Sequence, residues 1–258
     1  MGRFDKELAV IDDLKEKLAG MRPLRKEALQ RLLEDFMIEN TYNSNAIEGS
    51  TLTLQETALI IQEGMTIAGK SIREHLEVIG HRDAFEFIVS LSNEKEPLTD
   101  RRIKEIHSLV LIDNSSYRGR YRDVPVMIRG ALHHPSQPYL IEPQMEALMA
   151  EYEDMKRDKH IIEAIAEFHL RFEGIHPFID GNGRTGRLII NLELIKAGYL
   201  PVDIKFASRD RYYACFHTFF DSDKSPDLFA ELIIGYETEE LKRYIEIVEY
   251  ANSVRKEN

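Results

Sequence analysis

The segment HPFIDGNGRTGR, residues 176–187, constrains the fold more than any other part of this 258-residue chain. It combines three glycines and a proline with one acidic and two basic side chains, a mixture that neither a regular helix nor a strand tolerates. Apolar stretches with helical spacing lie directly before and after it. The segment therefore predicts a loop between two helices, in which the glycines let the backbone adopt positive φ and approach a ligand closely.

The side chains of this loop and the helix that follows it indicate its chemistry. The helix expected to start near Arg184 offers unpaired N–H groups and a positive dipole end, which together bind anions. Arg184 and Arg187 lie three residues apart, so we expect both to face the same anion. Asp180 supplies an oxygen ligand suited to Mg²⁺, and His176 is a base that works near neutral pH. The loop predicts nucleotide phosphate chemistry.

The rest of the chain is patterned as helices. Thr53 followed by Glu56 predicts a capping box at the start of a short helix. Longer helices are expected over 5–19, 23–48, 71–92, 99–112, 143–157, 160–174, 184–197, 208–220 and 226–255. Between 113 and 142, prolines, glycines and β-branched residues instead favour a small β-hairpin flap. We expect one all-α domain that carries this flap.

Composition argues against several classes of protein. The formal net charge of −11 disfavours a general nucleic-acid binder, which is usually basic. Cys215 is the sole cysteine, which excludes an internal disulfide framework and a cysteine-rich zinc site. The N-terminal stretch lacks the apolar core of a signal peptide, and no apolar run approaches membrane-spanning length. We expect a cytoplasmic protein with neither nucleic acid nor membrane among its partners.

The loop resembles a family signature. HPFIDGNGRTGR matches every fixed position of His-x-Phe-x-Asp/Glu-Gly-Asn-Gly-Arg-x-x-Arg, the signature of the Fic family. The resemblance spans roughly residues 40–235 and implies a helical bundle with a β-hairpin flap, and an enzyme that transfers AMP from ATP to a hydroxyl of a target protein. The expected parts are a helical extension (1–35) and a Fic domain (36–258) with an inhibitory helix (about 36–49), the flap (about 124–141) and the catalytic loop (176–187).

The resemblance implies roles for the first half of the loop. His176 would deprotonate the hydroxyl of the target, and Phe178 would anchor the loop in the core. Asp180 would hold Mg²⁺ against the α- and β-phosphates of ATP. Mg²⁺ is therefore the expected cofactor and ATP the expected co-substrate.

The second half of the loop would bind the phosphates. Gly181, Asn182 and Gly183 would form an anion hole, with Asn182 on the α-phosphate. Arg184 would hold the β-phosphate and Arg187 the γ-phosphate. The related Doc kinases carry lysine at the position of Gly183, so this glycine favours AMP transfer over phosphorylation.

A second motif lies far upstream. In SNAIEGS, Ser44-x-x-x-Glu48-Gly49 resembles the inhibitory motif Ser/Thr-x-x-x-Glu-Gly/Asn of the Fic family. Ser44 and Glu48 would share one face of a helix that Gly49 ends. The resemblance implies that Glu48 pairs with Arg187 and draws it away from the γ-phosphate. A glutamate before a C-terminal glycine is commonplace by itself, so the motif gains its meaning from the phosphate loop.

The segment VMIRGALHHPSQPYLIEPQM, residues 126–145, stands where the family has its flap. Such a hairpin edge would align the target protein by main-chain pairing. YRGRYR, directly upstream, also resembles the family pattern. His133 and His134 are assigned to the flap without a chemical role, because adjacent histidines in a proline-rich turn point to opposite sides.

The segment RDRYYACFHTFF resembles the helix that lines the adenine pocket of the family. Tyr213 is the candidate adenine contact, and Tyr212 is interpreted as a packing residue. Some relatives place an asparagine where this chain has Phe220, which leaves the base selectivity open, although a phenylalanine can stack on a purine.

The sequence therefore predicts a self-inhibited, Mg²⁺- and ATP-dependent protein adenylyltransferase that can also modify itself. Two alternatives stay open: a hydrolase that removes AMP with Glu48 positioning water, and a non-catalytic nucleotide-binding regulatory module. His176 argues against the module, because binding alone needs no base. The apolar stripe of the first helix could pair two chains in a homodimer or pack within one chain.

Overall fold

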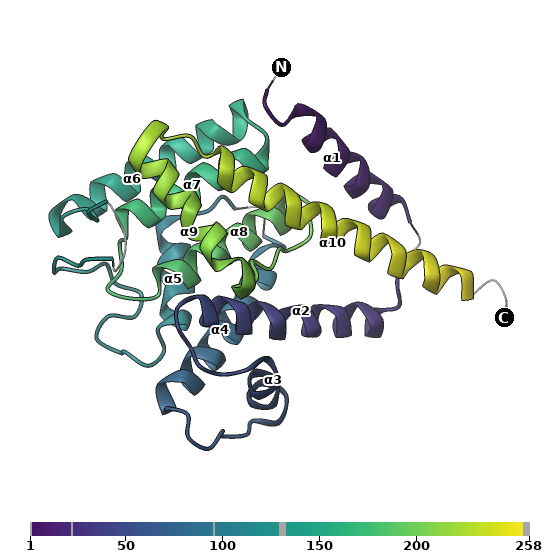
Figure 1. Cartoon of the computed structure of the whole chain (residues 1–258), viewed down its shortest axis with the longest axis horizontal. Coiled ribbons are helices and arrows are strands. Elements are labelled where there is room, and N and C mark those ends of the chain that lie inside the picture. Colours follow the sequence, from purple (N-terminus) through teal and green to yellow (C-terminus); the bar gives the residue numbers. More distant parts are fainter. Residues whose placement is uncertain (1, 22, 95, 129–132, 255–258) are drawn as a thin grey trace.

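The computed structural model describes residues 2–21, 23–94, 96–128 and 133–254, and these ranges are mostly helical (Figure 1). The elements in chain order are α1 (Asp5–Gly20), α2 (Lys26–Ile47), α3 (Leu54–Glu63), α4 (Ile72–Leu91), α5 (Asp100–Val110), α6 (Pro138–Asp158), α7 (Ile161–Ile175), α8 (Asn182–Lys196), η1 (Phe206–Ser208), α9 (Arg209–Thr218), η2 (Phe219–Asp223) and α10 (Asp227–Val254). No strand occurs within the described ranges. The prediction of an all-α bundle is confirmed.

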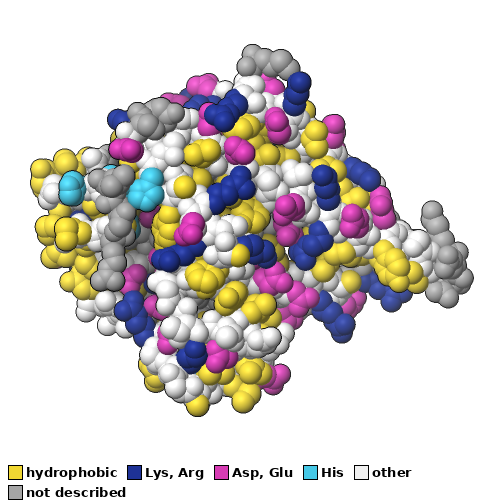
Figure 2. Space-filling model, viewed as in Figure 1, with side chains coloured by type: hydrophobic (Ala, Val, Ile, Leu, Met, Phe, Trp, Pro, Cys, Tyr) yellow, Lys and Arg dark blue, Asp and Glu magenta, His cyan; other side chains and the backbone are white. Residues whose placement is uncertain are grey.

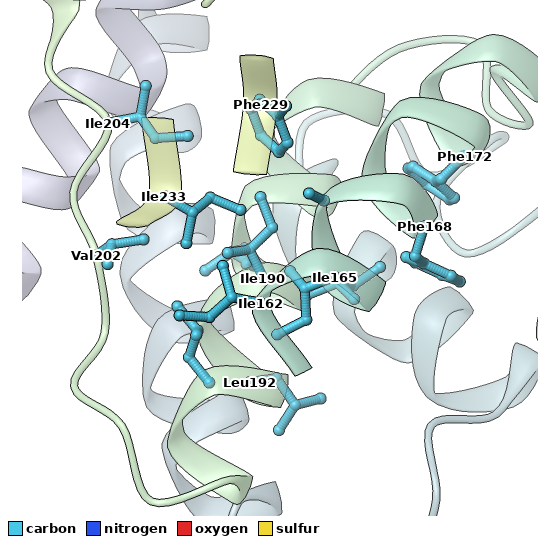
Figure 3. Close-up of a cluster of buried hydrophobic side chains, with 14 of the residues drawn as sticks. Ile162, Ile165, Phe168, Phe172, Ile190, Leu192, Val202, Ile204, Phe229 and Ile233 are labelled. Carbon is cyan, nitrogen blue, oxygen red and sulfur yellow. The ribbon is translucent and has the colours of Figure 1, made fainter. Parts of the chain in front are cut away.

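The centre of the bundle is the pair α7 and α8. Helix α7 packs against α6, α8 and α10, while α8 also packs against α4 and α5. Successive residues of α8, such as Ile189 and Ile190, are each 1% exposed, so this helix is buried around its whole circumference. Figure 3 shows Ile190 beside Ile165 of α7 and near Phe229 and Ile233 of α10. Both ends of the 176–181 connection are therefore fixed by core packing.

The N-terminal helix α1 lies along α10, the longest helix of the molecule (Figure 1). Leu8 and Ile11 of α1 are buried there, at 5% and 0% exposure. The next helix, α2, continues without a break through the expected boundary between residues 35 and 36. Leu8 and Ile11 belong to the apolar stripe for which the sequence allowed either a homodimer or packing within one chain. Over these two residues the stripe is covered within the chain.

The second half of α2 is held by buried polar groups. Asn40 and Asn43 donate from their side-chain amides to the two carboxylate oxygens of Asp203, at 3.2 and 2.7 Å. Lys205 pairs with the same carboxylate at 2.7 Å and also with Glu39 at 2.8 Å. Burial raises the pKa of Asp203, and Lys205 with the two amides opposes this effect. These contacts fix the helix that ends at the Ser44-x-x-x-Glu48-Gly49 motif.

Helix signals in the sequence are realised in detail. The Thr53 hydroxyl accepts a hydrogen bond from the backbone N–H of Glu56, and the Glu56 carboxylate accepts one from the backbone N–H of Thr53. The predicted capping box is confirmed. Helix α8 begins at Asn182, two residues before the expected start at Arg184, after Gly181 with φ 76°. The left-handed conformation of this glycine is what allows the earlier start.

The expected flap is corrected at its C-terminal end. Residues 138–141 form the first turn of α6, because Pro138 stands at the first helical position, where its fixed φ and missing N–H are favourable. Residues 124–128 and 133–137 contain no strand, and residues 129–132 lie outside the described residues. A hairpin over 124–141 was therefore wrong for the segment that becomes α6.

The surface carries mixed charges. On the face drawn in Figure 2, Lys and Arg side chains are interspersed with Asp and Glu side chains. Within the part of the chain that the structure covers, no helix is both long and apolar enough to cross a membrane.

The close approach of α4 and α5 at Gly80 yields a stability prediction. A Cβ added at Gly80 of α4 would lie 2.4 Å from the Leu109 carbonyl oxygen and 2.8 Å from Ile112 Cγ2, so α4 and α5 would have to separate. We expect Gly80→Ala to lower the free energy of unfolding by about 1–3 kcal/mol, measured by urea denaturation. Gly235→Ala is the control, since a Cβ there meets nothing within 4 Å and alanine favours a helix. Equal stability of the two variants would contradict this interpretation of the crossing.

Candidate functional site

The connection between α7 and α8 begins with a sharp change of backbone direction at His176. This residue caps α7 in the left-handed conformation, with φ 51° and ψ 61°. Arg122, 2% exposed, donates from Nε to the His176 carbonyl at 2.8 Å and from its backbone N–H to the Pro177 carbonyl at 3.0 Å. Its Nη1 donates to the Val124 carbonyl at 2.9 Å. One buried guanidinium therefore holds the start of the loop against the segment before α6.

The middle of the loop is clamped by Phe178 and Asn182. Phe178 is fully buried and stacks on His107 with ring centroids 3.6 Å apart. The Asn182 side chain accepts from the Phe178 N–H and donates to the Phe178 carbonyl, both at 2.9 Å. The Asn182 amide is therefore engaged inside the loop, and what it offers a ligand in this conformation is its main-chain N–H at the start of α8.

His107 fixes the next part of the loop. Its Nε2 lies 3.0 Å from the Asp180 carbonyl, and the Gly119 N–H donates to its Nδ1 at 2.9 Å. Burial lowers the pKa of His107 to about 4, so the ring is neutral near pH 7. Since Nδ1 accepts a hydrogen bond, the proton of the neutral ring resides on Nε2 and is donated to Asp180.

Asp180 is the acidic group at the edge of the site. Its Oδ2 pairs with Arg73 Nη2 at 2.6 Å and its Oδ1 with Arg184 Nη2 at 3.3 Å, while the side chain stays 43% exposed. Burial favours the neutral acid, but Arg184, the Gly181 N–H and Arg73 together lower the pKa of Asp180. The group is an ionised carboxylate that reaches solvent, and Arg73 is the cation nearest to it.

The two arginines of the loop contact different carboxylates within the chain, and the expectation that both would face the anion of a ligand stays a prediction. Arg184, 2% exposed, pairs with Glu77 of α4 at 3.4 Å and with Asp180. Arg187, 4% exposed, points instead to the end of α2. Each of these two buried guanidinium groups is thus paired with a carboxylate from another part of the chain, Arg184 with Glu77 of α4 and Arg187 with Glu48 at the end of α2.

Arg187 meets the motif at the end of α2. Its Nε donates to Ser44 Oγ at 3.0 Å, and its Nη2 donates to the Ser44 carbonyl at 2.9 Å and to Glu48 Oε1 at 2.8 Å. Its Nη1 donates to the Tyr212 hydroxyl at 3.2 Å. Burial lowers the pKa of this guanidinium, but Tyr212 and Glu48 more than offset the effect and raise it. The pairing expected between Glu48 and Arg187 is present.

Gly183 is the reason that Glu48 can approach. A Cβ at this position would lie 2.2 Å from Glu48 Oε1 and 3.0 Å from Arg187 Nη1. Any larger side chain, including the lysine of the related kinases, would therefore displace the Glu48 carboxylate from its present place.

These groups surround a cavity of about 330 Å³. Its lining includes a mainly polar group, Glu48, Glu173, His176, Asp180, Gly181, Asn182 and Gly183, and an aromatic group that forms the aromatic wall, His133, Tyr212, Tyr213, Phe216 and Phe220. Of the residues expected in the site, Arg184, Arg187 and Ser44 lie behind the cavity surface.

The aromatic wall contains the position that departs from the family pattern. Phe220 stacks on His133 with ring centroids 3.7 Å apart and packs on Gly174, where an added Cβ would lie 2.5 Å from Phe220 Cζ. Tyr213 lines the same cavity beside Arg209, whose guanidinium carbon lies 5.1 Å from the ring centroid.

Several residues that contribute to the site, His107 and Glu77 among them, were not found from the sequence. Arg122 belongs to the YRGRYR segment, which drew attention only as a family pattern. Tyr212 was interpreted as packing, yet its hydroxyl contacts both Arg187 and His169. Arg73 carries no local signal, because its contact with Asp180 spans 107 positions of the chain.

Comparison with known proteins places this site in a family. Residues 97–194 match the model of the Fic/DOC family. The chain is 38% identical to protein adenylyltransferase Fic of Nematostella vectensis over 219 residues, which make up 82% of this chain and 50% of the relative. It is 33% identical to protein adenylyltransferase fic-1 of Caenorhabditis elegans over 243 residues, 93% of this chain and 47% of the relative. The chain thus spans about half the length of the curated relatives it matches.

Solved structures agree with this assignment. A fragment of Fic-1 from C. elegans superposes with a TM-score of 0.84 at 32% identity, covering 95% of this chain and 73% of the fragment. A Fic domain containing signaling protein from Bacteroides thetaiotaomicron has a TM-score of 0.84 at 27% identity, covering 93% of this chain and 97% of that chain.

The role of Arg122 in holding the loop can be measured. Arg122→Met removes the donor of the part-buried hydrogen bonds to the carbonyls of His176 and Val124, at a cost of about 1–3 kcal/mol. We expect faster amide hydrogen exchange over residues 175–182, followed by mass spectrometry. Arg118→Met is the control, because the exposed Arg118 donates to Ser108 outside the loop. Unchanged exchange in Arg122→Met would contradict this role.

Proposed function

Because this chain belongs to the Fic family, we propose that it is a protein adenylyltransferase, which transfers AMP from ATP to a hydroxyl side chain of a protein. The observation that carries the proposal is the convergence of His176, Asp180 and the first turn of α8 on one cavity with an aromatic wall. The names of the relatives, protein adenylyltransferases, support the same activity.

The cavity suits a nucleoside triphosphate with its phosphates toward α8. The first N–H groups of α8 have no acceptor within the helix. They directly follow Gly181, which precedes the helix in a left-handed conformation with φ 76°. Gly181 and Gly183 bring the main chain to the cavity without side-chain bulk. On the aromatic wall, Tyr213, Phe216 and Phe220 offer apolar faces to a purine.

The reaction follows from these positions. The hydroxyl oxygen of the target attacks the α-phosphorus, and the bond from that phosphorus to the α–β bridging oxygen breaks. His176 takes the hydroxyl proton, and pyrophosphate leaves with the bonding electrons. The N–H groups at the start of α8 stabilise the negative charge that develops on the phosphates. The target would lie along the segment before α6, the place of the flap in the family.

Asp180 fits a Mg²⁺ site of the kind that nucleotides complete. In the described residues no group of three or more acidic, histidine or cysteine side chains is placed to hold a metal. One ionised, partly exposed carboxylate nevertheless suffices for Mg²⁺ when phosphates and waters supply the remaining ligands. A bound Mg²⁺ would neutralise charge on the phosphates, and Asp180 would have to release Arg73 to hold it.

Glu48 is proposed to inhibit the enzyme. Its carboxylate lies in the cavity, 35% exposed, and holds Arg187 at 2.8 Å against the end of α2. In this arrangement Arg187 contacts Ser44 and Tyr212 and lies behind the cavity wall, so it is withdrawn from the γ-phosphate. Productive ATP binding then requires Glu48 to leave Arg187.

The same position of Glu48 favours one second candidate. A carboxylate that shares a cavity with His176 can orient a water molecule for attack on the phosphorus of an AMP-modified side chain. This activity would release AMP and restore the free hydroxyl. Hydrolysis would require Glu48, whereas AMP transfer would not.

The proposal is tested with Glu48→Gly. We expect Glu48→Gly to take up AMP, on itself or on proteins of a lysate, about tenfold or more faster than the unaltered chain, which corresponds to a lost contact of about 1.4 kcal/mol or more. His176→Ala in the same background should lower the rate by a factor of about 10²–10⁴. Transfer is followed with ATP labelled on the α-phosphate and, separately, on the γ-phosphate, and by intact mass. Glu63→Gly, at the exposed end of α3, is the control.

Each outcome has one meaning. Label from the α-phosphate alone supports AMP transfer, whereas label from the γ-phosphate alone would indicate a kinase. Equal labelling of the unaltered chain and Glu48→Gly would refute inhibition by Glu48. If no variant is labelled, but the unaltered chain releases AMP from a modified protein and Glu48→Gly does not, the hydrolase is the function.

Arg73 predicts a change in the Mg²⁺ requirement. An exposed ion pair such as Arg73–Asp180 contributes about 0.2–1 kcal/mol, and its loss removes a competitor for the carboxylate. We expect Arg73→Ala, in the Glu48→Gly background, to lower the Mg²⁺ concentration for half-maximal transfer by up to about fivefold. Arg101→Ala, which loses an exposed contact with Glu105 far from the loop, is the control. An equal or higher Mg²⁺ requirement in Arg73→Ala would contradict this role.

A further inference from the structure

A buried carboxylate lies one helical turn before His176. Glu173, in the last turn of α7, is 8% exposed, and its Oε2 lies 3.5 Å from His176 Nδ1. Neither His176 Nδ1 nor the second carboxylate oxygen, Oε1, has a hydrogen-bond partner within the described residues. A buried ring nitrogen without a partner is unfavourable, and the Glu173 carboxylate is the acceptor beside it.

The carboxylate is fixed where it lies. The main chain of α8 passes directly against it, since a Cβ at Gly186 would lie 3.2 Å from Glu173 Oε1. Among the described residues, His176 is the one Lys, Arg or His side chain with a nitrogen within 4 Å of a Glu173 carboxylate oxygen. The nearby Arg187 is occupied by Ser44 and Glu48. Glu173 is thus a buried acid whose contacts point to a single ionic partner.

A carboxylate at Nδ1 determines which nitrogen of the ring is basic. A neutral imidazole carries one N–H, so donation from Nδ1 to Glu173 leaves Nε2 as the proton acceptor. Once Nε2 has taken a proton, the same carboxylate stabilises the imidazolium. Hydrogen bonds of this kind are often long in the absence of substrate, in keeping with the 3.5 Å separation.

We propose that Glu173 is a positioning residue, which holds the His176 ring in the Nδ1–H tautomer with Nε2 available to the substrate hydroxyl. The inference rests on the proposed function, in which His176 is the base. Two residues then position His176. Arg122 holds its main chain through a hydrogen bond to the His176 carbonyl at 2.8 Å, and Glu173 orients its ring. A role confined to packing at the end of α7 is the competing explanation.

The kinetic experiment uses the Glu48→Gly chain as the parent. Glu173→Leu removes the acceptor, and Glu173→Gln retains a neutral one at the same place. We expect Glu173→Leu to lower kcat for AMP transfer about 10–100-fold with KM for ATP unchanged, and Glu173→Gln to restore part of the loss. Glu163→Leu, on the same helix but away from the cavity, is the matched control and should leave kcat unchanged.

A second readout does not depend on activity. Nitrogen-15 NMR of histidine-labelled protein reports the tautomer of each of the nine rings, and His176→Asn assigns the signal of interest. At a pH where imidazole is neutral, the parent should show His176 with a protonated Nδ1, and Glu173→Leu should shift the proton to Nε2.

The two readouts together decide the matter. A lower kcat together with a changed tautomer supports the inference. An unchanged tautomer overturns it whatever happens to kcat, because a structural role alone would then account for any loss. A changed tautomer with an unchanged kcat overturns it as well. If the parent itself transfers no AMP, the proposed function has failed, and the tautomer alone still decides whether Glu173 orients His176.

Discussion

The burial of α8 on all sides is the constraint on which the site depends. Ile189 and Ile190 are each 1% exposed, and a helix packed among α4, α5 and α7 cannot rotate without opening the core. The first turn of α8 is therefore fixed in space, and with it the N–H groups that face the cavity. The short connection from Ile175 to Asn182 has to span two fixed ends, which is why it needs left-handed backbone at His176 and Gly181.

Three arginines of the site each have a carboxylate partner within the chain. Arg73, Arg184 and Arg187 each contact a carboxylate, from Asp180, Glu77 and Glu48 respectively. Phosphate binds a guanidinium in the same manner as a carboxylate does, so a nucleotide that reached these arginines would have to displace an internal partner. The Arg73 contact is exposed and weak, while Arg187 is almost fully buried. Asp180 and Glu48 both line the cavity, and of these two Glu48 is the carboxylate that holds the buried guanidinium of Arg187.

Local features of the structure could be predicted from the sequence, while contacts between distant segments could not. The capping box at Thr53 and the loop around Gly181 and Gly183 depend on neighbouring residues, and both were recognised. Pairing of Glu48 with Arg187 was inferred only because a family motif joined the two. Arg122 and Arg73 reach the loop across 54 and 107 positions, and nothing in their local sequence marks those partners. The predicted hairpin was wrong from Pro138 onward, because a proline after an extended segment fits a helix start as well as a turn.

The way α2 is anchored determines how Glu48 can be released. The body of the helix is held by Asn40 and Asn43 on buried Asp203, so moving it as a whole would leave several buried polar groups without partners. Glu48 itself lies at the cap, directly before Gly49, whose φ of 101° already ends the helical path. Turning this one residue breaks a single 2.8 Å ion pair and leaves the Asp203 contacts intact. A rearrangement at residues 48 and 49 with α2 in place would therefore remove the carboxylate from Arg187 at a lower cost than moving the helix, while the contacts of Arg187 with Ser44 and Tyr212 would remain.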